Sequence, residues 1–584
     1  MKRRNMPTRT GPVHVVTTRR QYKGRTYTTH LLRRSFRVGE RVHNETVGNL
    51  SHLPEEVIDL VRRALRGDAL IPADEALEIT ASRSHGHIQA VRSAMKALGV
   101  DQMLASRPSR ERDLVCAMIA ARVVAPHTKL ATTRWWQTTT LAEDLGVSDA
   151  SEDDLYAAMD WLLERQGAIE RKLAKRHLEP GSLVLYDLTS SYFEGTTCPL
   201  ARLGHNRDGK RNKLQVNYGL TTDRRGCPVA VSVFEGNTAD GATLAEQVGK
   251  LRKDFGIEKL VLVGDRGMIS QRAIDEELSE IAGLAWITAL RSERIRALVE
   301  GGGLQPGLFE ERNLFELAHD DYPGERLVAC RNTELKKLRA HKRESLLAAT
   351  SKELDKVRAM VARGTLRGRD KIGVRVGKVV NKYEVAKHFA LEIEDDRFAF
   401  ARREEAIAAE AALDGIYVIR TSVPAEQMDA AETVRSYKGL SNVERAFRSL
   451  KTIDLKVRPI HHRLADRVRS HIFLCMLAYY VEWHMREAWR ELLFADEDQE
   501  AKRTRDPVAA AKRSEKALEK VQTRKLPDGS VVHSFRTLLE DLATIVRNTC
   551  RTPGATDATA TFQIVTTASA PQQRALSLLD EIRP

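Results

Sequence analysis

The sequence predicts a multidomain α/β protein whose mixed-sheet core is interrupted by an insertion domain. Apolar runs that end at polar residues alternate with helical patterns between residues 181 and 290, in the order β-β-β-α-β-α-β. The alternation stops at about residue 291 and resumes with the apolar strand GIYVIRTS at 415–422. The chain of 584 residues has the length of about three or four domains. Its 42% apolar and 30% charged residues exclude a largely disordered or fibrous protein.

The N-terminal region, residues 1–80, is predicted to combine short strands with one helix. Segments rich in Val, Thr and aromatic residues lie within 13–50, with turns at 23–24 and 39–40. A helix is expected to follow Ser51 as its N-cap. Its apolar residues recur at helical spacing and are expected to form a buried face: Val57, Leu60, Val61 and Leu65.

A helical region is predicted to precede the core, which is itself made of two separate segments. Residues 81–180 carry the apolar spacing of helices and end at Pro180-Gly181, which indicates a helical domain. Residues 181–290 and 411–495 together are expected to form the mixed-sheet core, the second segment being mostly helical.

The remaining regions are an insertion and a C-terminal extension. Residues 291–410 mix basic helix with a Gly- and Lys-rich strand pair at 370–393, and are interpreted as an inserted domain. Residues 496–584 are expected to form a basic C-terminal region with one last helix at 531–548 and a loose tail at 551–572.

Positive charge gathers near the two ends of the chain. The net charge is +14, while residues 1–50 alone hold 12 basic and 2 acidic side chains and residues 501–530 hold 9 and 4. Such basic ends favour a polyanionic partner, because neutralised phosphates release counterions; basic arms that only aid solubility are the alternative. The longest uncharged apolar run, 472–481, is about half a membrane span, so no membrane partner is predicted.

Two acidic residues each follow a wholly apolar strand. Asp187 follows LVLY and Asp265 follows LVLVG. An aspartate at such a strand end can simply cap a turn, but two of them on neighbouring strands would lie side by side at a sheet edge. Their mutual repulsion is usually relieved by divalent cations such as Mg²⁺, and two such ions can support an in-line phosphoryl displacement.

A third carboxylate is predicted on the helix SYKGLSNVERAFRSLK. At about 100° per residue, Glu444 shares one arc with a phenol and two cations that could grip phosphate: Tyr437, Arg448 and Lys451. An ion pair between Glu444 and Arg448 on a solvated face is the alternative. The basic loop GHNRDGKRNKLQ could follow a DNA backbone through Lys210, Arg211 and Lys213, or be an ordinary solvated loop. The six cysteines lie far apart without a CxxC pair, so no zinc finger or disulfide framework is predicted.

These motifs resemble those of bacterial insertion-sequence DDE transposases. Asp187 in LVLYDLTSSYFEG, Asp265 in LVGDRGM and Glu444 look like the acidic triad of the group with a Tyr-x2-Arg-x3-Glu-x6-Lys motif. Tyr437 and Lys451 match this motif, and Leu440 stands at its Arg position. The segments VGNLSHLP, GHNRDGKRNKLQVNYGL and VFEGNTADGATL resemble the same group.

The resemblance implies a ribonuclease H-like core, split by an insertion between Asp265 and Glu444. It implies a Mg²⁺-dependent enzyme, with Mn²⁺ as a substitute, that holds the metal at the triad and cleaves and transfers DNA strands of its own insertion sequence, by cut-and-paste. The implied partners are double-stranded DNA, as terminal inverted repeats and target, and further copies of the chain in a homodimer or larger assembly. The implied location is the bacterial cytoplasm, at the nucleoid when DNA is bound. A metal-dependent ribonuclease H-like nuclease without strand transfer, and a transposase-derived DNA-binding protein, are the alternatives.

Overall fold

The computed structural model describes residues 10–68, 77–210, 212–552 and 561–583. It divides into two compact units, residues 1–82 with 548–564 and residues 83–547 with 565–584. Among the described residues no single helix is long and apolar enough to cross a membrane. The consecutive segments Arg110–Val124 and Lys129–Thr138 reach that length and composition only as a pair bent by 87°.

The first unit contains an antiparallel three-stranded sheet in the order β1-β2-β3. Both predicted turns are confirmed. Lys23 and Gly24 have φ of 50° and 75°, as a tight two-residue hairpin requires, and Gly39 has φ of 63°. The strands are β1 (Val13–Tyr22), β2 (Arg25–Val38) and β3 (Arg41–Asn49). A second small sheet has the order β16-β15-β4, with β4 (Glu78–Ser84), β15 (Val546–Arg551) and β16 (Thr561–Val565).

The helix of the N-terminal region differs from its prediction. Helix α1 (Glu55–Leu65) begins after Pro54, and the Ser51 hydroxyl accepts a hydrogen bond from the His30 N–H at 2.8 Å instead of capping the helix. The predicted buried face is wrong, because α1 packs against β1 through Ile58, which is 1% exposed. Three of the four predicted core residues are exposed by about two fifths: Val57, Leu60 and Leu65.

The second unit is built around an eight-stranded mixed sheet in the order β10-β11-β14-β9-β8-β5-β6-β7. Strands β5, β8 and β9 are parallel to one another, and every other neighbouring pair is antiparallel. The predicted strands between 181 and 290 and at 415–422 are all present. The strands are β5 (Leu183–Tyr192), β6 (Gln215–Asp223), β7 (Pro228–Glu235), β8 (Leu260–Val263), β9 (Leu284–Ala289), β10 (Leu314–Leu317), β11 (Arg326–Arg331) and β14 (Ile416–Thr421).

Helices cover this sheet and extend its core. The long helix α17 (Ala465–Ala488) packs against β7, α4 and α7. One continuous buried apolar cluster joins these helices to the sheet. The segment predicted to be helical contains α2 (Gly86–Ala97), α3 (Val100–Leu104), α4 (Arg110–Val124), α5 (Lys129–Trp135), α6 (Leu141–Asp144), α7 (Glu152–Glu164) and α8 (Gln166–His177).

Shorter helices connect the later strands. They are α9 (Leu244–Gly249), α10 (Gln271–Ala273), α11 (Ser292–Glu300), α15 (Ala430–Lys438) and α16 (Leu440–Arg448). The C-terminal part holds α18 (Gln499–Thr504), α19 (Glu515–Thr523), α20 (Phe535–Leu542) and α21 (Ala570–Asp580). Helix α20 is therefore not the last one. The expected loose tail at 551–572 is wrong where the structure describes it, because β16 pairs with β15 and α21 begins at a capping box of Ser569 and Gln572. Residues 553–560 of that tail lie outside the described residues.

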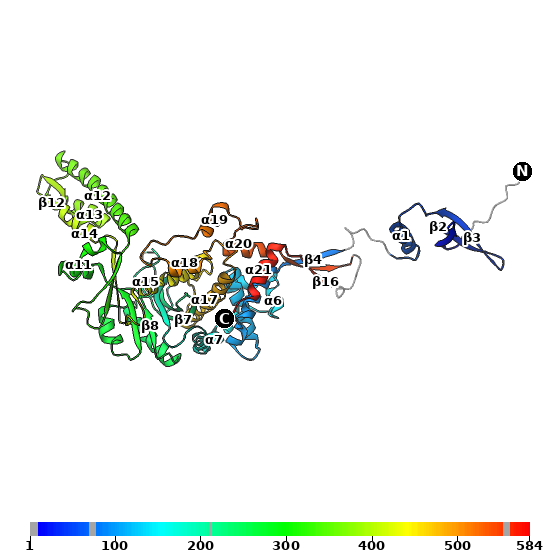
Figure 1. Ribbon diagram of the computed structural model, residues 1–584, viewed down its shortest axis with the longest axis horizontal. Helices are drawn as coiled ribbons and strands as arrows, with labels where there is room; N and C mark the ends of the chain where they lie inside the picture. Colours follow the sequence, from blue (N-terminus) through cyan, green and yellow to red (C-terminus); the bar gives the residue numbers. More distant parts are fainter. Residues whose placement is uncertain (1–9, 69–76, 211, 553–560, 584) are drawn as a thin grey trace. The chain divides into compact units, whose positions relative to one another are not determined.

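The segment between β11 and β14 has a core of its own. It contains α12 (Thr333–Ala362), α13 (Arg369–Tyr383), β12 (Phe389–Ile393), β13 (Phe398–Arg402) and α14 (Glu404–Ala412), which group together in Figure 1. The predicted strand pair at 370–393 is wrong in its first half. Ile372, Val376 and Val380 recur at four-residue spacing and are buried against α12, so this stretch is helix α13.

Candidate active site

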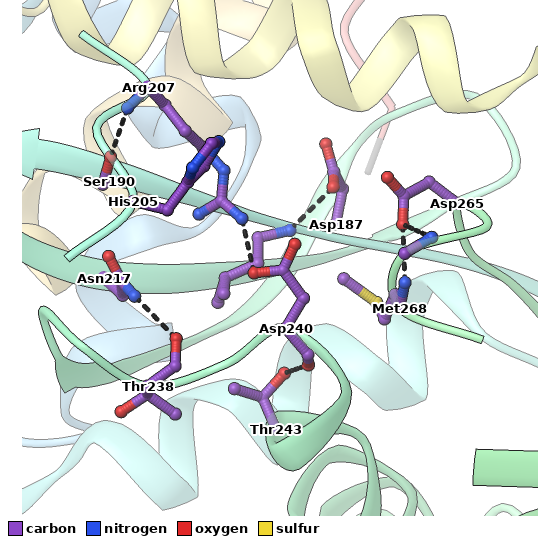
Figure 2. Close-up of polar contacts among 12 residues, drawn as sticks. Asp187, Ser190, His205, Arg207, Asn217, Thr238, Asp240, Thr243, Asp265 and Met268 are labelled. Atoms are coloured by element: carbon purple, nitrogen blue, oxygen red, sulfur yellow. Dashed lines mark hydrogen bonds and ion pairs between the residues drawn. The ribbon is translucent and has the colours of Figure 1, made fainter. Parts of the chain in front are cut away.

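The register of two parallel strands brings the predicted aspartates together. Leu185 on β5 is paired with Val263 on β8. Asp187 and Asp265 each come two residues after this pair. Since neighbouring strands lie about 4.8 Å apart, the two side chains become neighbours at the same end of the sheet, and Figure 2 shows them next to each other.

Asp187 is half-buried on β5, and its Oδ1 accepts a hydrogen bond from the Leu188 N–H at 2.8 Å. Burial, followed by the negative charge of Asp265, raises the pKa of Asp187 to about 7. Glu444 raises this pKa further, whereas the Leu188 N–H and the Arg207 guanidinium lower it. At neutral pH this carboxyl is therefore only partly ionised unless a cation compensates its charge.

Asp265 is held by the turn that follows β8. Its Oδ1 accepts hydrogen bonds from the backbone N–H groups of Gly267 at 3.0 Å and Met268 at 2.8 Å (Figure 2). Its Oδ2 makes no hydrogen bond or ion pair with any residue that the structure describes. The turn thus fixes the carboxylate and leaves one oxygen available to a ligand.

Glu444 approaches the aspartates from α16, which packs against β5. The helix is anchored by buried Val443, Ala446 and Phe447, while Glu444 is exposed and has no hydrogen bond or ion pair within the described part of the chain. Its charge nevertheless contributes to the raised pKa of Asp187. The three carboxylates share one region, although their oxygens do not all lie within 4.8 Å of one another.

Gly439 allows α16 to reach the sheet. It separates α15 from α16, and a Cβ atom at this position would lie 2.8 Å from the Ser436 carbonyl oxygen and 3.6 Å from the Leu185 methyl carbons. A side chain at this position would crowd the Ser436 carbonyl oxygen and so shift the junction between α15 and the helix that carries Glu444.

Tyr437 lies beside the acidic group and is half-buried. Burial, followed by the charge of Asp265, raises the pKa of Tyr437 to about 12, and Arg266 partly opposes this. Its hydroxyl therefore stays protonated and can donate a hydrogen bond to an anion. Leu440, at the Arg position of the motif, is partly buried and packs on the core instead of facing a ligand as a cation.

Arg448 and Lys451 line one cavity of about 270 Å³ together with other residues: Arg207, Asp208, Phe447, Thr452 and Arg458. Arg448 is exposed, and its guanidinium makes no hydrogen bond or ion pair with a described residue. Lys451 is buried, and its Nζ lies 3.0 Å from Asp208 Oδ1. Residues Ser449–Ile453 form a π-helical turn, so the helix that carries Lys451 is not a regular α-helix throughout.

The predicted basic loop is placed only in part. Lys210 is exposed, with its Nζ 5.8 Å from the centre of the Tyr192 ring, and Lys213 forms an ion pair with Glu194 at 2.9 Å. Arg211 lies outside the described residues.

Sequence reasoning missed two cations near the acids. Arg207 pairs with Asp240, and Arg458 pairs with Asp208, which also binds Lys451 (Figure 2 shows the first pair). Arg207 lies in the basic loop that the sequence singled out, so its neighbourhood was detectable. Arg458 carried no such signal, because its partner lies 250 residues earlier in the chain.

The oxygen atoms at this site suit a hard divalent cation. Asp187 and Asp265 each engage Oδ1 with the backbone, while their Oδ2 atoms and the whole Glu444 carboxylate have no partner among the described residues. Carboxylate oxygens of this kind are the ligands that Mg²⁺ takes from proteins.

Comparisons with known proteins identify two matching families. The family described as "Transposase DDE domain" matches residues 180–481, which is more than half of the chain, and "IS1634 family transposase, N-terminal domain" matches residues 15–73. No curated protein matches. Among solved structures, the chain is similar to the piggyBac transposase in a synaptic complex with hairpin DNA. The identity is 10%, the coverage is 78% of this chain and 76% of that one, and the TM-score of 0.33 is too low to support an argument.

Proposed function

Because this chain belongs to the DDE transposases of insertion sequences, an enzyme family that acts on DNA with divalent metal ions, we propose that Asp187, Asp265 and Glu444 are its catalytic triad. One observation carries this proposal. Asp187 and Asp265 each follow a pair of neighbouring residues on β5 and β8 by two positions, and the helix that bears Glu444 packs against β5. All three lie within the residues matched by the DDE domain.

The reaction proposed for this site is cleavage and transfer of DNA strands at the ends of the element, by a cut-and-paste route. Asp187, Asp265 and Glu444 would hold Mg²⁺, with Mn²⁺ as a substitute. When bound, the metal supplies activation of the attacking hydroxyl and stabilisation of the leaving 3′-oxygen. Asp187 must give up its proton before it can serve as a ligand, since its pKa of about 7 reflects an uncompensated charge.

The cations around the cavity position the DNA in this proposal. Among the described residues, Arg207 forms an ion pair with Asp240, Lys451 and Arg458 share Asp208, and Arg448 forms none, so cations outnumber their paired carboxylates around the cavity. The protonated Tyr437 hydroxyl and the unpaired Arg448 guanidinium donate to phosphate oxygens. The exposed loop that contains Lys210, Arg211 and Lys213 extends this contact along the DNA backbone.

The proposal also includes the fold of the catalytic core and the presence of an inserted domain. Three antiparallel strands, β5 to β7, followed by β8 and β9 parallel to β5, support a ribonuclease H-like core. The separate apolar core of α12, α13, β12 and β13 supports an inserted domain within residues 291–410. The other predicted limits, 1–80, 81–180, 181–290 with 411–495, and 496–584, remain predictions.

The proposed partners follow from charge and from the family. The basic N-terminal region recognises the terminal inverted repeats, target DNA joins at the catalytic cavity, and a homodimer or larger assembly holds two ends together. A location in the bacterial cytoplasm, at the nucleoid when DNA is bound, agrees with a DNA substrate.

The test is an in vitro assay on duplexes that carry the element's own terminal repeats. Asp187→Asn, Asp265→Asn and Glu444→Gln are each expected to reduce Mg²⁺-dependent cleavage at least about 10²–10³-fold while leaving DNA binding intact. Glu426→Gln, an exposed position without a described partner, is the matched control. Full cleavage by any triad variant would overturn the assignment.

The same assay separates the alternatives. Covalently joined strands identify a transposase, whereas nicked products without joining would indicate a nuclease that lacks strand transfer. Specific binding without metal-dependent cleavage by the unmutated protein would indicate a transposase-derived DNA-binding protein.

A further inference from the structure

Two histidines and a cysteine meet outside the acidic site. His177 ends α8, Cys227 lies in the turn between β6 and β7, and His484 lies on α17. Their ligand atoms all lie within 4.8 Å of one another, the only such group of three or more His, Cys, Asp or Glu residues in the described part of the chain. Cys227 Sγ is 3.8 Å from His484 Nε2 and 4.0 Å from His177 Nε2.

These distances are close to those around a bound metal. A tetrahedral zinc ion, with bonds of about 2.3 Å to sulfur and about 2.0–2.1 Å to nitrogen, holds these atoms about 3.5 Å apart. The two sulfur-to-nitrogen distances would therefore need to shorten by about 0.3–0.5 Å. Both imidazoles present the same nitrogen, Nε2, toward one sulfur atom.

Packing alone does not explain why two imidazole nitrogens lie close to one buried sulfur. A thiol has one weak proton to donate and a sulfur that accepts only weakly, so it is a poor partner for two imidazoles at once. His177 Nε2 also contacts the Tyr480 hydroxyl at 3.0 Å, but Cys227 is the one polar partner that the structure describes for His484 Nε2. His484 and Cys227 are buried.

The protonation states and charges are compatible with a cation. Burial lowers the pKa of His177 to about 4 and that of His484 to about 3, so both rings are neutral and keep a lone pair at pH 7. Four charged groups act on the cluster, and they balance: Asp223 and Glu487 against Arg176 and Arg225.

A route to the cluster is present. His484 lines a cavity of about 470 Å³ together with Trp483, Glu487 and Arg225. The cavity can admit an ion, and a water molecule from it can complete four-coordination.

We propose that His177, Cys227 and His484 bind one zinc ion, as a structural site separate from the acidic triad. The ion replaces the Cys227 thiol proton, which passes to solvent, and forms bonds to one thiolate sulfur and two imidazole nitrogens. It joins α8, the β6–β7 turn and α17, so it fastens the helical region to the edge of the sheet. The mixed sulfur and nitrogen donors select zinc over Mg²⁺.

Titration of metal-stripped, full-length protein with Co²⁺ tests this site directly. Unmutated protein is expected to bind one Co²⁺ with a thiolate-to-metal absorption band, which zinc removes. Cys227→Ser should abolish the band, and His484→Gln should weaken Co²⁺ binding at least about 100-fold. Cys475→Ser is the matched control, because Cys475 is equally buried and its Sγ is 4.0 Å from a single imidazole, that of His471.

Two further measurements make each outcome decisive. Asp265→Asn should keep the band, since the acidic triad contains no sulfur, so this result does not depend on the proposed catalytic role. Added zinc should raise the melting temperature of the unmutated protein and not that of Cys227→Ser. Absence of the band in unmutated protein, or its equal loss in Cys475→Ser, would overturn the proposal.

Discussion

The environment of Asp187 opposes the negative charge of its carboxylate. Its pKa of about 7, raised by burial and by Asp265, lies above the ordinary value of about 3.9 expected in the unfolded chain. Between about pH 4 and pH 7 the folded protein keeps a proton that the unfolded chain has lost. The contribution of this group to the free energy of unfolding therefore falls as the pH rises through that window.

We expect Asp187→Asn to melt at a higher temperature than the unmutated protein at pH 8 in the presence of a chelator. The two proteins should melt at similar temperatures near pH 4, where Asp187 is protonated. Thermal unfolding followed by circular dichroism measures both values. The control Glu426→Gln should show no such pH-dependent gain, and an Asp187→Asn variant with no advantage at pH 8 would contradict the inferred burial of charge.

Arg448 and Lys451 share a cavity but differ in their surroundings, so their loss should have different effects. Arg448→Ala is expected to leave the melting temperature unchanged, because the side chain is exposed and unpaired among the described residues. It should weaken DNA binding and reduce the slope of log K against log salt by about 0.9. Fluorescence anisotropy at several salt concentrations measures this slope.

Lys451→Ala should also lower stability, since it breaks a buried ion pair with Asp208. Equal melting temperatures for the Arg448→Ala and Lys451→Ala variants would show that the buried pair does not support the fold.

At the scale of elements, the break between α15 and α16 controls the position of Glu444. Gly439→Ala places a methyl group 2.8 Å from the Ser436 carbonyl oxygen. We expect the displaced helix to reduce strand cleavage by up to about 10²-fold. Single-turnover cleavage assays measure this loss.

Gly373→Ala is the matched comparison, because it lies within α13 and an added Cβ there meets nothing within 4 Å. It should keep full activity and raise stability by about 0.5–1 kcal/mol. If both glycine variants cleave DNA like the unmutated protein, Gly439 is not needed to position α16.

The strands could be predicted from the sequence more reliably than the helix faces. The buried strands of the large sheet are short apolar runs bounded by turn residues, a pattern that tertiary contacts rarely override. Helix α13 was mistaken for strands because its β-branched residues favour strands and its two glycines lower its helix propensity. The buried face of α1 depends on where β1 lies, and the sequence of the helix does not contain that information.

In the candidate site too, some residues could be predicted from the sequence and others could not. Both aspartates were predictable, because the end of an apolar strand marks a position before any contact is known. Lys451 was expected on the face of a regular α-helix, and the π-helical turn in which it lies has no simple sequence signal. The His177, Cys227 and His484 cluster was invisible, because its members lie 50 and 257 residues apart.

At the scale of the whole molecule, the segment between β11 and β14 could be removed without separating the strands that it joins. Arg331 and Ile416, the residues that flank it, are paired across two antiparallel strands. We therefore expect the protein to fold when a short Asn-Gly turn replaces residues 332–415, because such a turn joins antiparallel strands directly. Cooperative unfolding near the original melting temperature would confirm this, and loss of cooperative unfolding would contradict it.

The N-terminal unit offers a second test at this scale. Removal of residues 1–76 leaves β4, and thus its sheet with β15, intact. We expect this truncation to abolish preference for terminal repeats while salt-sensitive, sequence-independent DNA binding remains. Competition binding with unrelated duplexes measures the preference, and unchanged specificity would refute a recognition role for this region.

The order of the three acids along the chain determines when each of them is added during protein synthesis. Between Asp265 and Glu444 lie 178 residues, including the whole insertion. A ribosome adding about 5–20 residues per second takes about 9–36 s to cross this stretch. With the proposed triad, a growing chain holds two of its three metal-binding acids for that entire interval without being able to cut DNA. Premature termination there releases only inert fragments.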